Sequence, residues 1–129
     1  MSDKSPRTAS DETPDRPRLA ITVGDAAGVG PELSLACASL ESVQNRCQPI
    51  LIGPAEIVQH IAKNLSLPMP PVVSADRLDD LGDQPSVLVD VGDVSLDSFA
   101  PGHFSRQTGR ASFRAVDLAI GETSRGTFD

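Results

Sequence analysis

A glycine-rich stretch near the start of the chain is the segment best placed to bind a ligand. Residues 22–32 read Thr-Val-Gly-Asp-Ala-Ala-Gly-Val-Gly-Pro-Glu, between a short apolar run and a predicted helix. Ligands of α/β proteins bind where such turns leave the carboxyl ends of parallel strands. Gly24, Gly28 and Gly30 can adopt positive φ angles and let the backbone approach a ligand closely. The stretch therefore predicts either a ligand-lining turn or a tight turn with a purely structural role.

The spacing of these glycines narrows the choice of ligand. It is G-x-x-x-G-x-G, which differs from the G-x-G-x-x-G dinucleotide fingerprint and from the G-x-x-x-x-G-K-[ST] phosphate loop, whose lysine is missing here. Backbone N–H groups at the start of the following helix favour an anion, but the carboxylates of Asp25 and Glu32 oppose one. Glu32 is itself favoured in a first helical turn by the helix dipole, so the structural interpretation stays open.

The histidines and aspartates do not form a recognisable metal site in the sequence. Nothing near His60 supplies a second ligand at a usable spacing, so we expect a surface or edge residue there, and we expect His103 to be a solvated loop residue. The acidic stretch lacks the glycine and the closing glutamate of a calcium-binding loop, which indicates a solvated, charge-rich segment. Its residues are Asp76, Asp79, Asp80, Asp83, Asp90, Asp93 and Asp97.

The cysteines and a group of arginines also have structural interpretations. Cys37 and Cys47 do not form a Cys-x-x-Cys pair. We expect both to be reduced and buried, with Cys37 a small core residue rather than a nucleophile. Several arginines give the last predicted helix positive charge and could face a phosphate, although solvation of the helix is the favoured interpretation. They are Arg106, Arg110, Arg114 and Arg125.

Composition excludes several classes of protein. The 129 residues carry 11 Lys and Arg against 18 Asp and Glu, a net charge of −7, whereas nucleic-acid binding requires a basic surface. No apolar run approaches the roughly 20 residues that span a bilayer, and residues 1–17 lack the apolar core of a signal peptide. We expect a cytoplasmic protein that binds neither nucleic acid nor membrane, with residues 1–17 as a disordered tail.

Apolar runs and helix-like stripes alternate along residues 18–129, which predicts strands followed by helices. Strands are expected at 18–23, 50–53, 72–73 and 86–91, and helices from Pro31, from Pro54 and from 108–110 to Gly126. This order is typical of an α/β sheet with parallel neighbours and right-handed crossovers. Residues 127–129 resemble the entry to another strand, so we expect the chain to be a fragment of a longer protein.

Each predicted helix has an apolar stripe that we expect to face the core. The first stripe is Leu33, Ala36, Cys37 and Leu40, and the second is Ile57, Val58, Ile61, Ala62 and Leu65. The third is spaced by Phe113, Val116 and Ile120 and widened by Ala115, Leu118 and Ala119.

Two segments resemble one enzyme family. Residues 21–32, Ile-Thr-Val-Gly-Asp-Ala-Ala-Gly-Val-Gly-Pro-Glu, are similar to I-T-x-G-D-P-A-G-I-G-P-E, the opening motif of the 4-hydroxythreonine-4-phosphate dehydrogenases of pyridoxal phosphate biosynthesis. Ala26 stands where that family has proline. Residues 101–109, Pro-Gly-His-Phe-Ser-Arg-Gln-Thr-Gly, with Ala111, resemble the family's P-G-x-x-S-x-x-S-G-x-A-A segment. The resemblance covers residues 18–129 and implies the N-terminal part of an α/β/α sandwich of the isocitrate/isopropylmalate dehydrogenase type.

For a complete enzyme, the resemblance implies oxidation of the hydroxyl of 4-phosphohydroxy-L-threonine by NAD or NADP. It further implies loss of carbon dioxide from the resulting β-keto acid, a divalent metal that polarises the oxygen, and a homodimer whose subunits share the active site. Gly24, Asp25, Gly28 and Gly30 are then expected to bind the cofactor or shape its pocket. A related dehydrogenase for a four-carbon sugar-acid phosphate and a truncated, non-catalytic remnant are the alternatives.

The resemblance also implies that the catalytic machinery lies outside this chain. The family's T-x-P-x-x-K loop, its G-H-T-E motif and its metal-binding histidines would follow Asp129, and neither His60 nor His103 matches them. We therefore expect no catalytic and no metal-ligating residue among these 129 residues, and no dehydrogenase activity from the chain alone.

Overall fold

The computed structural model describes residues 16–92 and 94–129. Most of the tail predicted for residues 1–17 therefore lies outside the described residues. Arg16 and Pro17 are described, and both contact the folded part of the chain. The Arg16 guanidinium donates to the backbone carbonyls of Gln44 and Cys47, at 2.7 and 3.2 Å. The Gln48 N–H donates to the Pro17 carbonyl at 2.8 Å.

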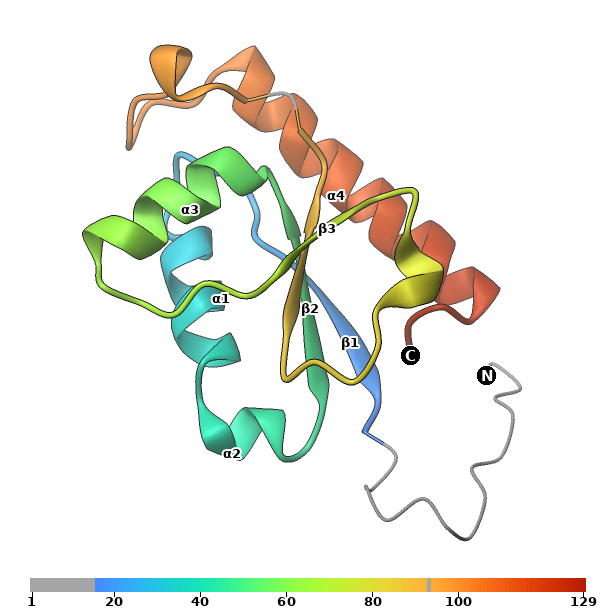
Figure 1. The fold of residues 1–129 in the computed structure, drawn as a ribbon. Coiled ribbons are helices and arrows are strands. Elements are labelled where there is room, and N and C mark those ends of the chain that lie inside the picture. The colour runs from blue at the N-terminus through green and yellow to red at the C-terminus, as the bar shows by residue number, and fades with distance from the viewer. Residues whose placement is uncertain (1–15, 93) are drawn as a thin grey trace, which may run out of the picture.

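Four strands form one sheet in the order β1-β2-β4-β3 (Figure 1). β1 spans Arg18–Thr22, β2 spans Gln48–Gly53, β3 spans Val72–Ser74 and β4 spans Val87–Asp90. These strands confirm the ones expected from the apolar runs. Because every neighbouring pair is parallel, all carboxyl ends lie at one edge of the sheet, where ligand-binding turns are expected.

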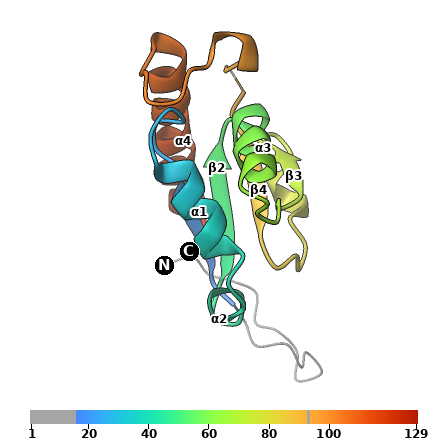
Figure 2. The same cartoon turned by 90° about the vertical axis from the view of Figure 1, so that its left-hand side faces the viewer.

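Helices cover both faces of this sheet (Figure 2). α1 (Gly30–Ala38) and α3 (Ala55–Asn64) pack on one face, and α4 (Arg106–Arg125) packs on the other. The remaining helical elements are short: α2 (Glu41–Gln44) and the 3-10 helices η1 (Leu78–Asp80) and η2 (Leu96–Ser98). The predicted α/β fold, a parallel sheet with flanking helices, is confirmed.

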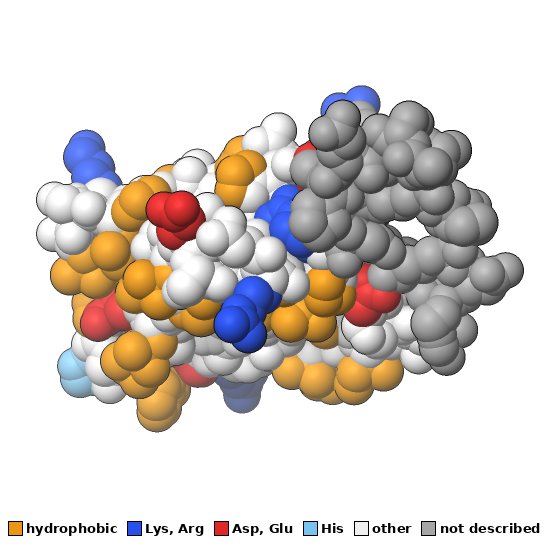
Figure 3. Space-filling model, turned by 90° about the horizontal axis from the view of Figure 1, so that it is seen from below, with side chains coloured by type: hydrophobic (Ala, Val, Ile, Leu, Met, Phe, Trp, Pro, Cys, Tyr) orange, Lys and Arg blue, Asp and Glu red, His pale blue; other side chains and the backbone are white. Residues whose placement is uncertain are grey.

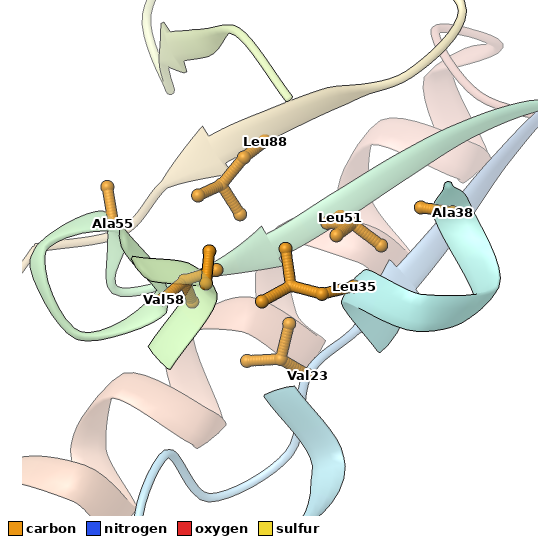
Figure 4. Packing of buried hydrophobic residues seen from close by; sticks show 8 residues of the cluster. Val23, Leu35, Ala38, Leu51, Ala55, Val58 and Leu88 are labelled. Carbon is orange, nitrogen blue, oxygen red and sulfur yellow. The ribbon is translucent and has the colours of Figure 1, made fainter. Parts of the chain in front are cut away.

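The alternation of side chains along β2 divides the core into two parts. Leu51 points to the face covered by α1 and α3, where it packs with Leu35 and Val58 (Figure 4). Ile50 and Ile52 point to the opposite face and pack beneath α4. All five side chains are buried, and burying an aliphatic side chain of this size contributes about 1.5–3 kcal/mol to folding.

The side of α1 that faces the core is not the predicted one. Leu33 and Leu40 are 63% and 53% exposed, and Ala36 and Cys37 are exposed as well. The buried residues of α1 are Pro31, Ser34, Leu35 and Ala38. They have the same helical spacing but mostly smaller side chains, which let α1 lie close to α3 and the sheet.

The predicted inner stripe of α4 is half right. Ala115 is buried, and Leu118 and Ala119 pack against the core, as expected. The prediction is wrong for the large residues of the stripe, because Phe113, Val116 and Ile120 are 71%, 43% and 63% exposed. The buried residues of α4 are Thr108, Ala111 and Ala115. Ala115 packs with the strand residues beneath α4, whereas Ala111 packs with Ala26 and Ile57.

The ends of α4 lie near the predicted positions. The helix begins at Arg106, slightly before the expected 108–110, and Gly126 ends it in the left-handed region with a φ of 87°. Phe128 is then buried, and the Asp129 N–H donates to the Arg18 carbonyl at 2.8 Å. The Arg18 N–H donates in turn to the Asp129 carboxylate at 2.8 Å, so the last residue lies beside the start of β1.

The two ends of the sheet differ in their surroundings. On the side seen from the amino ends of the strands, apolar side chains lie among charged and polar ones (Figure 3). The carboxyl ends lead into the glycine-rich turn and the loop before α4.

Within residues 16–92 and 94–129, no helix has both the length and the apolarity that a membrane span needs.

Candidate functional site

The glycine turn, residues 23–30, connects β1 to α1 at the carboxyl edge of the sheet. Val23 still pairs with β2, because its N–H donates to the Ile52 carbonyl at 3.1 Å. Gly24 has a φ of 76°, a conformation that L side chains rarely adopt. A Cβ on Gly30 would lie 1.9 Å from the Val23 carbonyl oxygen, so glycine is required for α1 to begin this close to β1.

Neither a positive φ nor a steric clash of a Cβ atom explains the glycine at position 28. Among the glycines of the turn only Gly24 has a positive φ, and a Cβ on Gly28 would meet the Asp25 carbonyl at 3.4 Å and the Phe104 ring at 4.0 Å, which are ordinary contacts. Gly28 does line a cleft. Its missing side chain therefore leaves room on the cleft wall rather than relieving strain in the turn.

Asp25 is bonded within the protein through both carboxylate oxygens. Oδ1 accepts from the Ala27 N–H at 2.9 Å, and Oδ2 accepts from the Thr108 hydroxyl at 3.1 Å. The Asp25 backbone carbonyl accepts from the Gly28 N–H at 2.9 Å. Asp25 thus shapes the turn from inside.

The second motif, residues 101–109, packs directly on the glycine turn. The Ser105 side chain accepts from the Thr108 N–H at 3.1 Å, and the Thr108 hydroxyl accepts from the Ser105 N–H at 3.0 Å. This reciprocal pair is a capping box at the start of α4. The Gly102 N–H donates to the Ala27 carbonyl at 2.8 Å. The two segments that carry the family resemblance are therefore neighbours in space.

A cleft of about 410 Å³ opens beside the glycine turn, a volume within the usual range of small-molecule sites. Residues 26–29 of the turn form one wall. The side chains of Ile61, Leu65 and Phe99 form much of the apolar remainder. An apolar cavity with a few polar groups is the usual character of a ligand site, so this cleft is the strongest candidate at the carboxyl edge.

Three polar side chains line this cleft in the described part of the chain: Glu32, His60 and Asn64. Glu32 lies in the first turn of α1, and the Asn64 amide nitrogen and the His60 Nε2 are 3.1 Å apart on α3. His60 is half-buried, which confirms its predicted place at the edge of the helix. Among residues 16–92 and 94–129, no Lys or Arg lines this cleft. The lining suits a neutral, partly apolar group such as a nucleoside better than a pyrophosphate.

A second cleft, of about 440 Å³, lies between β4 and α4. Arg114 and Arg125 line it together with the acidic residues Asp117 and Glu122, and Arg125 forms an ion pair with Glu122 at 2.8 Å. Arg106 and Arg110 are exposed and do not line it. Asp90 lines this cleft as well, so the two arginines face three acidic residues there. The arginines therefore do not gather into one anion site.

Asp90 follows β4 and is a structural residue that the sequence reasoning missed. It was expected in a solvated acidic stretch, but its Oδ1 accepts from the Ala55 N–H at 2.9 Å and from the Gly92 N–H at 2.8 Å. It thereby caps α3 and fixes the loop after β4. A third cleft, of about 370 Å³, lies beside it. The position of Asp90 at the end of an apolar run was the available signal.

The other acidic residues do not assemble a metal centre in the described part of the chain. Among residues 16–92 and 94–129, no group of three or more His, Cys, Asp or Glu side chains could hold a metal ion. Asp76 accepts from the Ser74 hydroxyl at 2.5 Å, and this hydrogen bond lowers the pKa of Asp76. Asp93 lies outside the described residues.

The cysteines differ from each other. Cys37 is exposed, contrary to the prediction, whereas Cys47 is buried as predicted. Burial raises the pKa of the Cys47 thiol; the charge of Cys37 acts in the same direction and Arg16 opposes it. Neither cysteine lines the cleft beside the glycine turn. His103 is exposed in its loop, as predicted.

Similarity to known proteins agrees with the two motifs. A protein of Clostridium botulinum, provisionally named a D-threonate 4-phosphate dehydrogenase, is 28% identical over 118 residues. The 4-hydroxythreonine-4-phosphate dehydrogenase of Trichlorobacter lovleyi is 29% identical over 106 residues. The chain resembles these dehydrogenases over most of its length. No protein-family model matches it.

A solved structure extends the similarity to the fold. The crystal structure of a 4-hydroxythreonine-4-phosphate dehydrogenase from Burkholderia phymatum matches with a TM-score of 0.77 and 25% identity, over 88% of this chain and 34% of that one. The Clostridium and Trichlorobacter relatives are covered to 35% and 32%, and they match 89% and 81% of this chain. The chain thus spans about a third of the length of the proteins it resembles.

Proposed function

We propose that this chain forms part of an oxidoreductase that oxidises a hydroxyl group of a phosphorylated four-carbon acid. The observation that carries the proposal is the contact between Asp25 and Thr108. It joins the two motifs that resemble the dehydrogenase family, beside a cleft of suitable size. The names of the relatives, all dehydrogenases, support the reaction class.

Two substrates fit this class. One is 4-phosphohydroxy-L-threonine, with a role in pyridoxal phosphate biosynthesis. The other is a four-carbon sugar-acid phosphate, which the name of the Clostridium relative favours, because D-threonate 4-phosphate is such a compound. Both carry a carboxylate, a phosphate and a hydroxyl β to the carboxylate, so the same oxidation gives a β-keto acid that loses carbon dioxide.

We propose that the cofactor is NAD or NADP and that residues 26–29 face its neutral part. Gly28 leaves an open stretch of backbone on the cleft wall, while Gly24, Asp25 and Gly30 shape the turn behind it. When bound, the nicotinamide would accept the hydride. The lining residues contribute an apolar, partly enclosed surface that excludes water from a bound group. The pyrophosphate would have to be held elsewhere, because no Lys or Arg lines this cleft.

The remaining features of the complete enzyme stay proposals. They are a divalent metal whose ligands lie beyond these 129 residues, a homodimer with a shared active site, and a cytoplasmic location without nucleic-acid or membrane partners. No step is assigned to a metal through the residues described here, since they offer no ligand group. The chain's own contribution is to bind and orient the cofactor.

A pair of glycine variants tests the cofactor cleft. Gly28→Ala adds a methyl group on the cleft wall with only ordinary contacts, and Gly109→Ala adds one on exposed α4, where nothing lies within 4 Å. We expect Gly28→Ala to raise the Kd for NADH about tenfold, the effect of roughly 1.4 kcal/mol, with unchanged unfolding, and Gly109→Ala to leave the Kd unchanged. Fluorescence titration of NADH gives the Kd, and circular dichroism checks the fold.

The outcomes separate the interpretations. Failure of the unmodified chain to bind NADH would overturn the cofactor role of the cleft. Equal Kd values for both variants and the unmodified chain would reduce the motif to a structural turn. We also expect no NADH formation by the chain with either substrate and a divalent metal; turnover above a protein-free control would contradict the placement of the catalytic residues outside it.

A further inference from the structure

The contact between the two motifs is made by one buried hydroxyl, that of Thr108. Thr108 is 1% exposed, and its Oγ1 lies 3.1 Å from Oδ2 of Asp25 and 3.2 Å from the Ser105 carbonyl. A hydroxyl has one proton to donate, and an ionised carboxylate is a stronger acceptor than a neutral carbonyl. The proton is therefore directed to Asp25.

The same oxygen also accepts a hydrogen bond, from the Ser105 N–H at 3.0 Å. On the other side of the carboxylate, Oδ1 of Asp25 holds the Ala27 N–H at 2.9 Å. The Ala27 carbonyl in turn accepts from the Gly102 N–H at 2.8 Å. A continuous series of hydrogen bonds thus runs from the start of α4, through Asp25, to the turn that forms the cleft wall.

Helix capping alone does not account for the placement of Thr108. The capping box needs the bonds between Ser105 and Thr108 and makes no use of the bond to Asp25. Thr108 does not line the cleft, so its hydroxyl would not touch a ligand there. What its hydroxyl does fix is the orientation of the carboxylate that holds the backbone at Ala27.

We propose that Thr108 is a positioning residue, which holds the Asp25 carboxylate and through it fixes residues 26–28 in the shape that receives the ligand. The effect on the turn stands on the geometry of this chain. The consequence for a nicotinamide cofactor rests on the proposed function.

Three substitutions test the effect on the turn. Thr108→Val keeps the shape of the side chain and removes the hydroxyl, Thr108→Ser keeps the hydroxyl, and Thr123→Val removes an exposed hydroxyl from the same helix. In the chain without ligand, hydrogen exchange measured by NMR should accelerate about tenfold or more at the Ala27 and Gly28 amides in Thr108→Val, the scale of one charge-assisted hydrogen bond. Exchange should stay within about twofold in the other variants.

The core amide of Leu51 is the internal reference. Equal acceleration at Leu51 and in the turn would show a general loss of stability and overturn the positioning role. Unchanged exchange in the turn would overturn it too. Should Thr108→Val fail to fold by circular dichroism, Thr108→Cys, a far weaker donor of similar size, provides the same comparison.

Binding of NADH is the second measurement, and it separates the two proposals. Thr108→Val should raise the Kd about tenfold, and Thr108→Ser should restore it to within about twofold. If the unmodified chain does not bind NADH, the cofactor proposal fails, while the exchange data still decide whether Thr108 positions the turn. If the turn loosens and the Kd stays the same, its shape does not set affinity and the proposal is overturned.

Discussion

Helices α3 and α4 cover opposite faces of one sheet with opposite kinds of side chain. α3 presents the fully buried Val58 to one face. α4 presents Ala115 to the other face and leaves Phe113 and Ile120 in solvent. Both helices are amphipathic, but in α4 the largest apolar residues lie on the side that faces solvent.

The sheet explains this difference. The central strands β2 and β4 present Ile50, Ile52, Val87 and Val89 to the α4 face, and Leu51 and Leu88 to the other. Cores fill to a nearly constant density, so the face on which β2 and β4 place four branched residues accepts small side chains from α4. The volume that the sheet leaves free thus favours the observed orientation of α4, in which Phe113, Val116 and Ile120 stay exposed.

The largest effect on the free energy of unfolding is expected in α1, where the buried Leu35 and the exposed Leu33 lie two residues apart. Leu35→Ala should lower the free energy of unfolding by about 2–5 kcal/mol, because it removes a fully buried side chain and leaves a cavity. Leu33→Ala removes the same atoms from a side chain that is 63% exposed and should change the stability by at most about 0.5 kcal/mol. Urea unfolding of the two variants measures the difference. A larger loss of unfolding free energy in Leu33→Ala than in Leu35→Ala would show that Leu33, and not Leu35, faces the core.

An intermediate effect is expected on the α4 face. Ala115→Leu should lower the free energy of unfolding by about 1–3 kcal/mol, because the enlarged side chain meets a packed sheet. Phe113→Ser is the matched change on the outer side and should stay within about 0.5 kcal/mol. Thermal unfolding followed by circular dichroism distinguishes them. A stabilising Ala115→Leu would mean that the sheet leaves more room beneath α4 than close packing implies.

The prediction of the buried side succeeded best where a helix has only one apolar stripe that could face the core. The stripe of α3 is the only apolar stripe of that helix, and Ile57, Val58 and Ala62 are buried as predicted. The prediction is wrong for Leu65, which follows the last residue of α3 and is 47% exposed. In α1, two stripes share the same spacing, and the pattern favours the larger residues. The buried stripe contains Pro31 and Ser34, which no hydrophobicity criterion selects. The choice depends on strand side chains that are distant in sequence.

The candidate site shows the same division. The glycine turn and its position after the first strand were readable from the motif, and Pro31 marks the start of the helix that follows. The bond from Thr108 to Asp25 was not readable, because the two residues belong to elements that meet only once the sheet is formed. The Ser105-x-x-Thr108 spacing is compatible with a helix cap, but nothing local in the sequence indicates a second partner for the threonine.

The smallest effect concerns the two thiols and tests the orientation of α1 without altering it. Cys37 is exposed on the outer side of α1 and Cys47 is buried before β2, so at pH 8 we expect a disulfide reagent to modify Cys37 at least about tenfold faster, since the thiolate is the reactive form and needs access. Cys37→Ser and Cys47→Ser each leave one thiol and assign the rates. Comparable rates would contradict the outward position of Cys37.

The pH dependence of Cys47 follows from the direction of its pKa. Burial raises that pKa above the ordinary value of 9.0, so the unfolded chain releases this proton at lower pH than the folded one. The stabilising contribution is therefore fully present below pH 9, and it is lost as the pH rises through the raised pKa of the folded chain. Cys47→Ala should flatten the fall in unfolding free energy above pH 9. Cys37→Ala should reduce the fall to a smaller extent, because burial is the larger cause of the raised pKa and the charge of Cys37 the smaller one. The contrast would separate the thiol that the fold protects from the one that the outward side of α1 leaves in solvent.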